Sequence, residues 1–151
     1  MNKVATIILN RNLPEVTERL YEHLSKYDGD QTDIYVVEAG TDERNLSRYT
    51  TWHANSDEAT VSGLRYGRGM NYGLIQLLNE GKYDHYNAFF LLTNDTEFKP
   101  QPTLSVLLEI LNKHPRVGIL SPCSERWGAR LLLTVEKTKY FWFIHNNAYL
   151  I

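Results

Sequence analysis

The chain of 151 residues is most informative first for what it lacks. It has one cysteine, Cys123, which excludes an internal disulfide and a cysteine-based zinc site. No apolar run approaches the roughly 20 residues that a membrane span needs, and no apolar segment typical of a signal peptide precedes Asn10. The formal net charge is -2, so the basic excess expected of a nucleic-acid-binding protein is missing. We expect one cytoplasmic domain with no nucleic-acid partner and no membrane span.

Glycine-rich phosphate loops are also missing after the first apolar segment. Neither Gly-x-Gly-x-x-Gly nor the Walker pattern occurs there. Gly67-Arg68-Gly69 followed by Gly73 is only superficially similar, because no clear strand precedes it. A bound phosphate would then need a metal ion and one or two arginines to neutralise it.

Short apolar segments alternate with helical patterns along the chain. We predict strands over residues 4–9, 34–37, 50–53, 88–92 and 117–120. The first predicted helix begins at Pro14 and ends before Gly29, the second ends at Gly81, and the third ends before Pro115. Residues 55–63 have the composition of a loop. This order predicts an α/β fold with a mostly parallel central sheet and helices on both faces.

Polar side chains follow three of the predicted strands. Asn10 and Asn12 follow the first, Glu38 the second, and Asn94 and Asp95 the fourth. In a parallel sheet these ends lie at one edge, where ligands of open α/β sheets bind. The alternative is that these side chains cap helices and satisfy loop backbone groups.

Residues 89–97 carry the strongest single signal, a continuous apolar run that ends abruptly in polar and acidic groups. A carboxylate at Asp95 can hold a divalent cation against a phosphorylated ligand. Glu97 could be a second ligand of this cation. The alternative is that it faces solvent or pairs with Lys99. His145 and Trp127 are further candidates, for a metal and a sugar respectively. The alternatives are a packed or partly exposed histidine, which is the commoner case, and a tryptophan that anchors a loop.

Five segments together resemble the nucleotide-sugar domain of family 2 glycosyltransferases, which have the Rossmann-like GT-A fold. They are residues 4–12, 36–42, 68–74, 91–95 and 117–122, in the order and spacing of the family. The resemblance covers nearly the whole chain. Glu38 replaces the aspartate that is usual in the second segment, and Thr93 replaces the first acid of the Asp-x-Asp motif.

The resemblance implies a role for each matching residue. Leu9, Asn10 and Asn12 would line the base pocket, and Glu38 would accept a hydrogen bond from the base or ribose, which favours a UDP- or dTDP-sugar. Asn94 would contact the ribose, and Asp95 would bind Mn²⁺ or Mg²⁺ at the diphosphate. Arg65 and Arg68 are candidates for the phosphates, and the alternative for each is an ordinary surface arginine. Asn71 is a further candidate for the nucleotide sugar, and its alternative is a role at the start of a helix.

The implied reaction is inverting transfer of a glycosyl group to a saccharide or other hydroxyl acceptor. The family's catalytic base lies on a motif beyond residue 151, and the aromatic, apolar segment 139–151 is unusual for a natural terminus. We therefore expect residues 1–151 to be a donor-binding domain cut before its acceptor and catalytic-base segment. The alternatives are a non-catalytic nucleotide-binding domain or fragment of this fold, an unrelated doubly wound domain, and an interaction domain.

Overall fold

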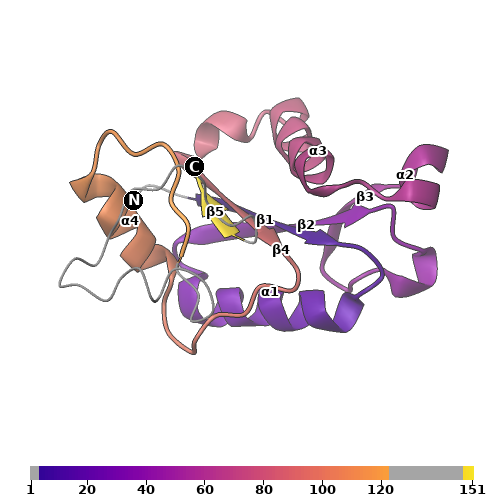
Figure 1. The fold of residues 1–151 in the computed structure, drawn as a ribbon, viewed down its shortest axis with the longest axis horizontal. Helices are drawn as coiled ribbons and strands as arrows, with labels where there is room; N and C mark the ends of the chain where they lie inside the picture. Colours follow the sequence, from indigo (N-terminus) through magenta and orange to yellow (C-terminus); the bar gives the residue numbers. More distant parts are fainter. Residues whose placement is uncertain (1–3, 123–147) are drawn as a thin grey trace.

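The computed structural model describes residues 4–122 and 148–151, which build one five-stranded sheet with helices on both faces (Figure 1). The strands are β1 (Val4–Asn10), β2 (Thr32–Ala39), β3 (Thr50–Ala54), β4 (Ala88–Thr93) and β5 (Ala148–Leu150). The α-helices are α1 (Pro14–Asp28), α2 (Asp57–Ser62), α3 (Tyr66–Asn79) and α4 (Leu104–Lys113). Two 3-10 helices, η1 (Glu43–Asn45) and η2 (Tyr83–His85), lie in the connections.

The strand order is β3-β2-β1-β4-β5. β1 to β4 are all parallel, and only β5 runs antiparallel, against β4. The predicted α/β class with a mostly parallel sheet is therefore confirmed. The carboxyl ends of β2, β1 and β4 lie next to one another, because Asn10 pairs with Glu38 and Leu9 pairs with Thr93.

Two apolar layers sandwich the sheet. Alternate residues of each strand point to opposite faces. On one face Ile8 and Phe90 pack with residues of α1 and α4, and on the other Ile7 and Leu91 pack with residues of α3. Figure 1 shows α1 and α3 on opposite sides of the sheet. None of the helices in the described part of the chain has the length and hydropathy of a membrane span.

The predicted start and end of the first helix are confirmed. α1 begins at Pro14, whose fixed φ and missing N–H suit the first helical turn. Leu20 and Leu24 form its buried stripe. At its end the buried Asp28 carboxylate accepts the backbone N–H groups of Thr103 and Leu104, at 2.9 Å from each to Oδ1. α1 therefore holds the start of α4 as well as covering the sheet.

The prediction of a loop over residues 55–63 is wrong, because α2 lies within it. Ser56 caps this helix by accepting the N–H of Ala59 at 3.3 Å, and Asp57 and Glu58 lie in its first turn, where they suit the helix dipole. These start signals are present in the sequence. The segment is too short and has too few apolar residues to show a helical hydrophobic pattern, so they are not recognised as a helix start.

The predicted fifth strand over residues 117–120 is also wrong. Of that segment only Leu120 joins the sheet, through an isolated antiparallel bridge to Leu150. The place beside β4 is taken instead by β5, where Leu91 pairs with Tyr149. A pairing partner from so far along the chain leaves no local signal, so the apolar run at 117–120 was the better candidate on periodicity alone.

Gly40 allows α2 to pack against the end of β2. Its φ is +79°, and a Cβ added there would lie 1.8 Å from the carbonyl oxygen of Ala59. The chain then returns to the same place, since Leu64 N donates to Ala39 O at 3.1 Å. α2 thus forms a wall beside the carboxyl end of the sheet, in contact with the backbone of the loop after β2.

We predict that Gly40→Ala destabilises the protein more than Gly81→Ala does. Gly81 also has a positive φ, +67°, but nothing lies within 4 Å of a Cβ added there. The control therefore carries only the backbone strain, about 1–2 kcal/mol, whereas Gly40→Ala must also displace α2. Urea unfolding of the two variants measures the difference, and equal losses would contradict the close approach of α2.

Candidate functional site

Three predicted site residues lie side by side at the carboxyl ends of neighbouring strands. Asn10 ends β1, Glu38 is its partner in β2, and Asn94 follows the last residue of β4. Asn10 Nδ2 donates to Glu38 Oε2 at 2.8 Å, and Asn94 Nδ2 donates to Asn10 Oδ1 at 3.1 Å. We call this hydrogen-bonded set the Asn94–Asn10–Glu38 row. It spans the sheet edge at which ligands of parallel sheets bind.

Glu38 is fully buried, with 0% of its surface exposed. Besides the contact with Asn10, its Oε1 accepts the N–H of Ser47 at 3.0 Å and the hydroxyl of Thr50 at 2.8 Å. The sequence analysis missed both of these partners, since nothing local connects residues 9 and 12 positions away. Direct contact between Glu38 and a nucleobase stays a prediction. A ligand that reached this carboxylate would compete with donors from the protein.

Asn10 is the centre of the row and is also fully buried. Its Oδ1 accepts the N–H of Leu13 at 3.1 Å, at the start of α1, in addition to the amide of Asn94. Its backbone carbonyl accepts the hydroxyl of Thr41 at 3.2 Å. Asn10 therefore satisfies a backbone group of the loop before α1, which is one of the alternatives that the sequence left open, while α1 itself has no side-chain cap.

Asn94 and Asp95 form the turn after β4. The half-buried Asn94 is fixed by its bond to Asn10, by a second bond from Nδ2 to Thr17 Oγ1 at 3.1 Å, and by its backbone N–H on Leu9 O at 3.2 Å. The next residue, Asp95, is exposed and makes no hydrogen bond or ion pair within the described residues. A rigid turn thus presents one uncommitted carboxylate at the rim.

Asp95 fits a cation that takes only one protein ligand. No cluster of three or more His, Cys, Asp or Glu side chains occurs in the described part of the chain. Mg²⁺ and similar ions keep several waters and use one or two carboxylates when substrate phosphates supply the remaining ligands. The side chain at Asp95 is suited to that mode of binding and not to a site made of protein ligands alone.

Asn12 joins two loops at the rim. Its φ of +59° is in the left-handed region, which asparagine tolerates better than most residues. Its Oδ1 accepts the backbone N–H of Asp42 at 2.9 Å and the side-chain amide of Asn45 at 3.2 Å. The exposed Asn12 therefore fastens the loop after β1 to the loop after β2, beside the row.

Leu9 lies on the opposite face of the sheet from Asn10, under α3. A Cβ added at Gly69 would lie 2.9 Å from Leu9 Cδ1, and one added at Gly73 would lie 3.0 Å from Ile7 Cγ2. Gly69 and Gly73 thus allow α3 to approach β1 closely, which is a packing role, whereas nothing lies within 4 Å of a Cβ added at Gly67.

The remaining predicted residues lie at the start of α3. Arg65 directly precedes the helix, and Arg68 and Asn71 are exposed on its first two turns. Arg68 Nη1 lies 2.7 Å from Glu58 Oε1 of α2, and this hydrogen bond lowers the pKa of Glu58 and raises the pKa of Arg68. Within the described residues Arg65 has no such partner. The structure does not bring these three side chains into the row.

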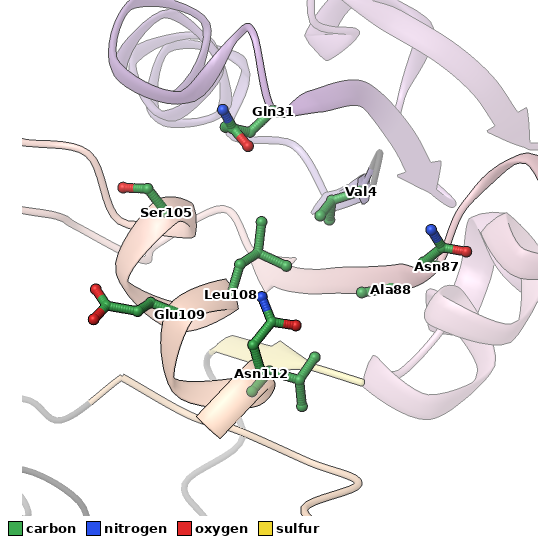
Figure 2. Close-up of a pocket in the computed structure, with 9 residues that line it drawn as sticks. Val4, Gln31, Asn87, Ala88, Ser105, Leu108, Glu109 and Asn112 are labelled. Carbon is green, nitrogen blue, oxygen red and sulfur yellow. The ribbon is translucent and has the colours of Figure 1, made fainter. Parts of the chain in front are cut away.

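A hollow of about 390 Å³ lies at the amino ends of the strands, opposite the carboxyl ends where the row lies (Figure 2). Figure 2 shows Leu108 of α4 reaching toward Val4 and Ala88, which begin β1 and β4. None of the predicted site residues lines it. The hollow and the row are therefore separated by the length of the strands.

The segment that follows Asp95 is anchored on α1. The ring of Phe98 packs against Phe90 and lies 6.1 Å from the ring of His23, measured between centroids. His23 Nε2 is buried without a hydrogen-bond partner, and burial lowers the pKa of this histidine. With Asp28 holding the start of α4, both ends of the Asp95 loop are fixed to the same helix.

Comparison with known proteins adds no assignment. No model of a known protein family matches the chain. A search of curated proteins finds no significant match. The resemblance to family 2 glycosyltransferases stays a prediction from the motifs, and Cys123, Trp127 and His145 lie outside the described residues.

We predict that Asn10→Ala lowers the free energy of unfolding by about 3 kcal/mol. The change leaves a buried carboxylate oxygen of Glu38 without its amide donor and removes the bond to the N–H of Leu13 before α1. Urea unfolding measures the loss. The matched control is Asn71→Ala, at an exposed position of α3, for which the expected change is within about 0.5 kcal/mol. Similar losses in both variants would show that the row contributes little.

We also predict that His23 makes the protein less stable as the pH falls from 7.5 to 5.5. The pKa of His23 is lower in the native state than its ordinary value of 6.5, so the unfolded state binds the proton first. The free energy of unfolding therefore falls as the pH drops through about 6.5. His23→Phe keeps a ring against Phe98 and should reduce this dependence. An unchanged dependence in the variant would assign it to other histidines.

Proposed function

We propose that this domain binds a nucleotide-diphosphate sugar at the carboxyl edge of its sheet. One observation carries the proposal: a buried hydrogen-bonded row, Asn94–Asn10–Glu38, ends in a fixed turn that presents the uncommitted carboxylate of Asp95. Buried polar groups with full hydrogen bonding make a rigid support, and a rigid support is what a ligand site at a loop requires.

In this proposal the polar residues have two kinds of role. Asn94 and Asn12 present polar groups at the rim to the ribose and the base, and Glu38 acts chiefly by holding Asn10 in place. Asp95 binds Mn²⁺ or Mg²⁺ together with the diphosphate. When bound, such a cation stabilises negative charge on the departing nucleoside diphosphate.

The reaction that we propose is inverting transfer of the glycosyl group to a hydroxyl acceptor, with a UDP- or dTDP-sugar as donor. It rests on the five sequence segments that resemble family 2 glycosyltransferases in order and spacing. The second candidate is a nucleotide-binding domain of the same fold without transferase activity. Thr93 in place of the first motif acid favours it, because Asp95 is then the only motif carboxylate. Binding of donor without transfer or hydrolysis would identify the second candidate.

We predict that UDP stabilises the protein against heat in the presence of Mn²⁺ and that Asp95→Ala removes this effect. Ligands of the native state raise stability by RT ln(1 + [L]/Kd), so a titration of the melting temperature gives the affinity. The loss of the metal-binding carboxylate should weaken UDP binding at least tenfold, or about 1.4 kcal/mol. The variant should keep the melting temperature of the unliganded protein, since Asp95 is exposed and makes no hydrogen bond or ion pair within the described residues.

Glu97→Ala is the matched control, because it removes the same charge from an exposed position on the same loop. It should keep the Mn²⁺-dependent effect of UDP. Loss of the effect in Glu97→Ala alone would move the metal to Glu97. Retention of the effect in both variants would show that the cation binds elsewhere.

A further inference from the structure

The guanidinium of Arg11 is held against the end of α2. Arg11 lies in the loop between β1 and α1, directly after the buried Asn10. Its Nη1 donates to the carbonyl oxygen of Ser62 at 3.1 Å, and its Nη2 donates to that of Val61 at 3.5 Å. These are the last two residues of α2, so the Arg11 side chain connects the loop after β1 to the end of α2.

Gly63 makes room for this guanidinium. Its φ is +67°, and a Cβ added there would lie 2.3 Å from Arg11 Nη1 and 2.4 Å from Cζ. Any other residue at this position would push the Arg11 side chain away from α2. The backbone of Arg11 is fixed as well, since Asn10 on one side and Asn12 on the other are both held by hydrogen bonds.

The charge of Arg11 has no carboxylate partner among the described residues. Its two hydrogen-bond acceptors are neutral carbonyl groups. A guanidinium has five N–H donors, so three remain for another acceptor. Arg68, by contrast, is paired with Glu58 at 2.7 Å, so its charge is already balanced by a carboxylate.

We propose that Arg11 is the cation that binds the phosphates of the nucleotide at this edge, a role that the sequence motifs assign to Arg65 and Arg68. This inference rests on the proposed function and names a residue of the same site. A guanidinium already fixed by two carbonyls loses less side-chain freedom on binding, and its remaining N–H groups match the planar geometry of phosphate oxygens. The side chain of Arg65 has no hydrogen bond or ion pair that fixes it among the described residues.

A purely structural role for Arg11 must be separated from this one. A cation at the end of a helix is favourable for the helix itself, because it interacts with the last carbonyl groups. A structural role would change the stability of the protein and would affect all ligands of the edge alike. A phosphate-binding role would change the affinity only for ligands that carry phosphate. The ratio of the affinities for UDP and uridine therefore distinguishes the two.

The test compares the dissociation constants of UDP and uridine, in Mg²⁺ buffer, for the wild type, Arg11→Gln, Arg11→Lys and Arg68→Gln, by ligand-observed NMR. In Arg11→Gln the UDP affinity should fall at least tenfold while the uridine affinity changes less than twofold. Arg68→Gln should keep the wild-type ratio. Arg11→Lys keeps the charge without the fork, so its ratio should lie between those of the wild type and Arg11→Gln.

Each contrary result has a distinct meaning. A wild-type ratio in Arg11→Gln, or equal weakening of UDP and uridine, overturns the phosphate role of Arg11 and leaves the proposed function intact. A reduced ratio in Arg68→Gln alone returns the role to Arg68. If Arg11→Gln does not fold, a wild-type ratio in Arg11→Lys overturns the inference. Absence of UDP binding by the wild type refutes the proposed function itself.

Discussion

The side chain of Asn10 is the contact on which this edge of the molecule depends. One carboxamide donates to Glu38 and accepts from both Asn94 and the backbone of Leu13, directly before α1. An asparagine suits this place because it offers a donor and an acceptor on a short, stiff stem. Aspartate would set two carboxylates against each other, and leucine would leave Glu38 and Asn94 without their partners. The ends of three strands and one helix thus share a single hydrogen-bonded centre.

Around this centre, glycines allow helices and side chains to pack closely against the strands and loops. Gly40 and Gly63 have positive φ and lie against α2 and the Arg11 guanidinium respectively, whereas Gly69 is part of α3 and lies against Leu9 of β1. In each place a methyl group would meet backbone or a packed side chain. The segment that superficially resembled a phosphate loop therefore serves the approach of a helix to the sheet. The carboxyl edge is bounded by α2 on one side and the Asp95 turn on the other.

Periodicity and strand-end chemistry predicted the local parts of this fold. The start of α1 at Pro14, the buried run of β4 and the meeting of Asn10, Glu38 and Asn94 follow from rules that act over a few residues or from the geometry of parallel strands. What failed were contacts made at long range or by weak signals: β5 beside β4, the short α2, and the enclosure of Glu38 by Ser47 and Thr50. The position of Arg11 could not be predicted, since it depends on Gly63, more than fifty residues away.

The antiparallel β5 has a consequence for solubility. Its three residues hydrogen-bond along β4, and the pairing continues beyond it through Phe89 and Ile151 in both directions. Without that cover, the apolar strand from Ala88 to Thr93 would be an outer strand with a free row of amide and carbonyl groups. Such an uncovered margin is a template for self-association. A stretch of only three residues therefore covers the outer side of β4 and removes that template.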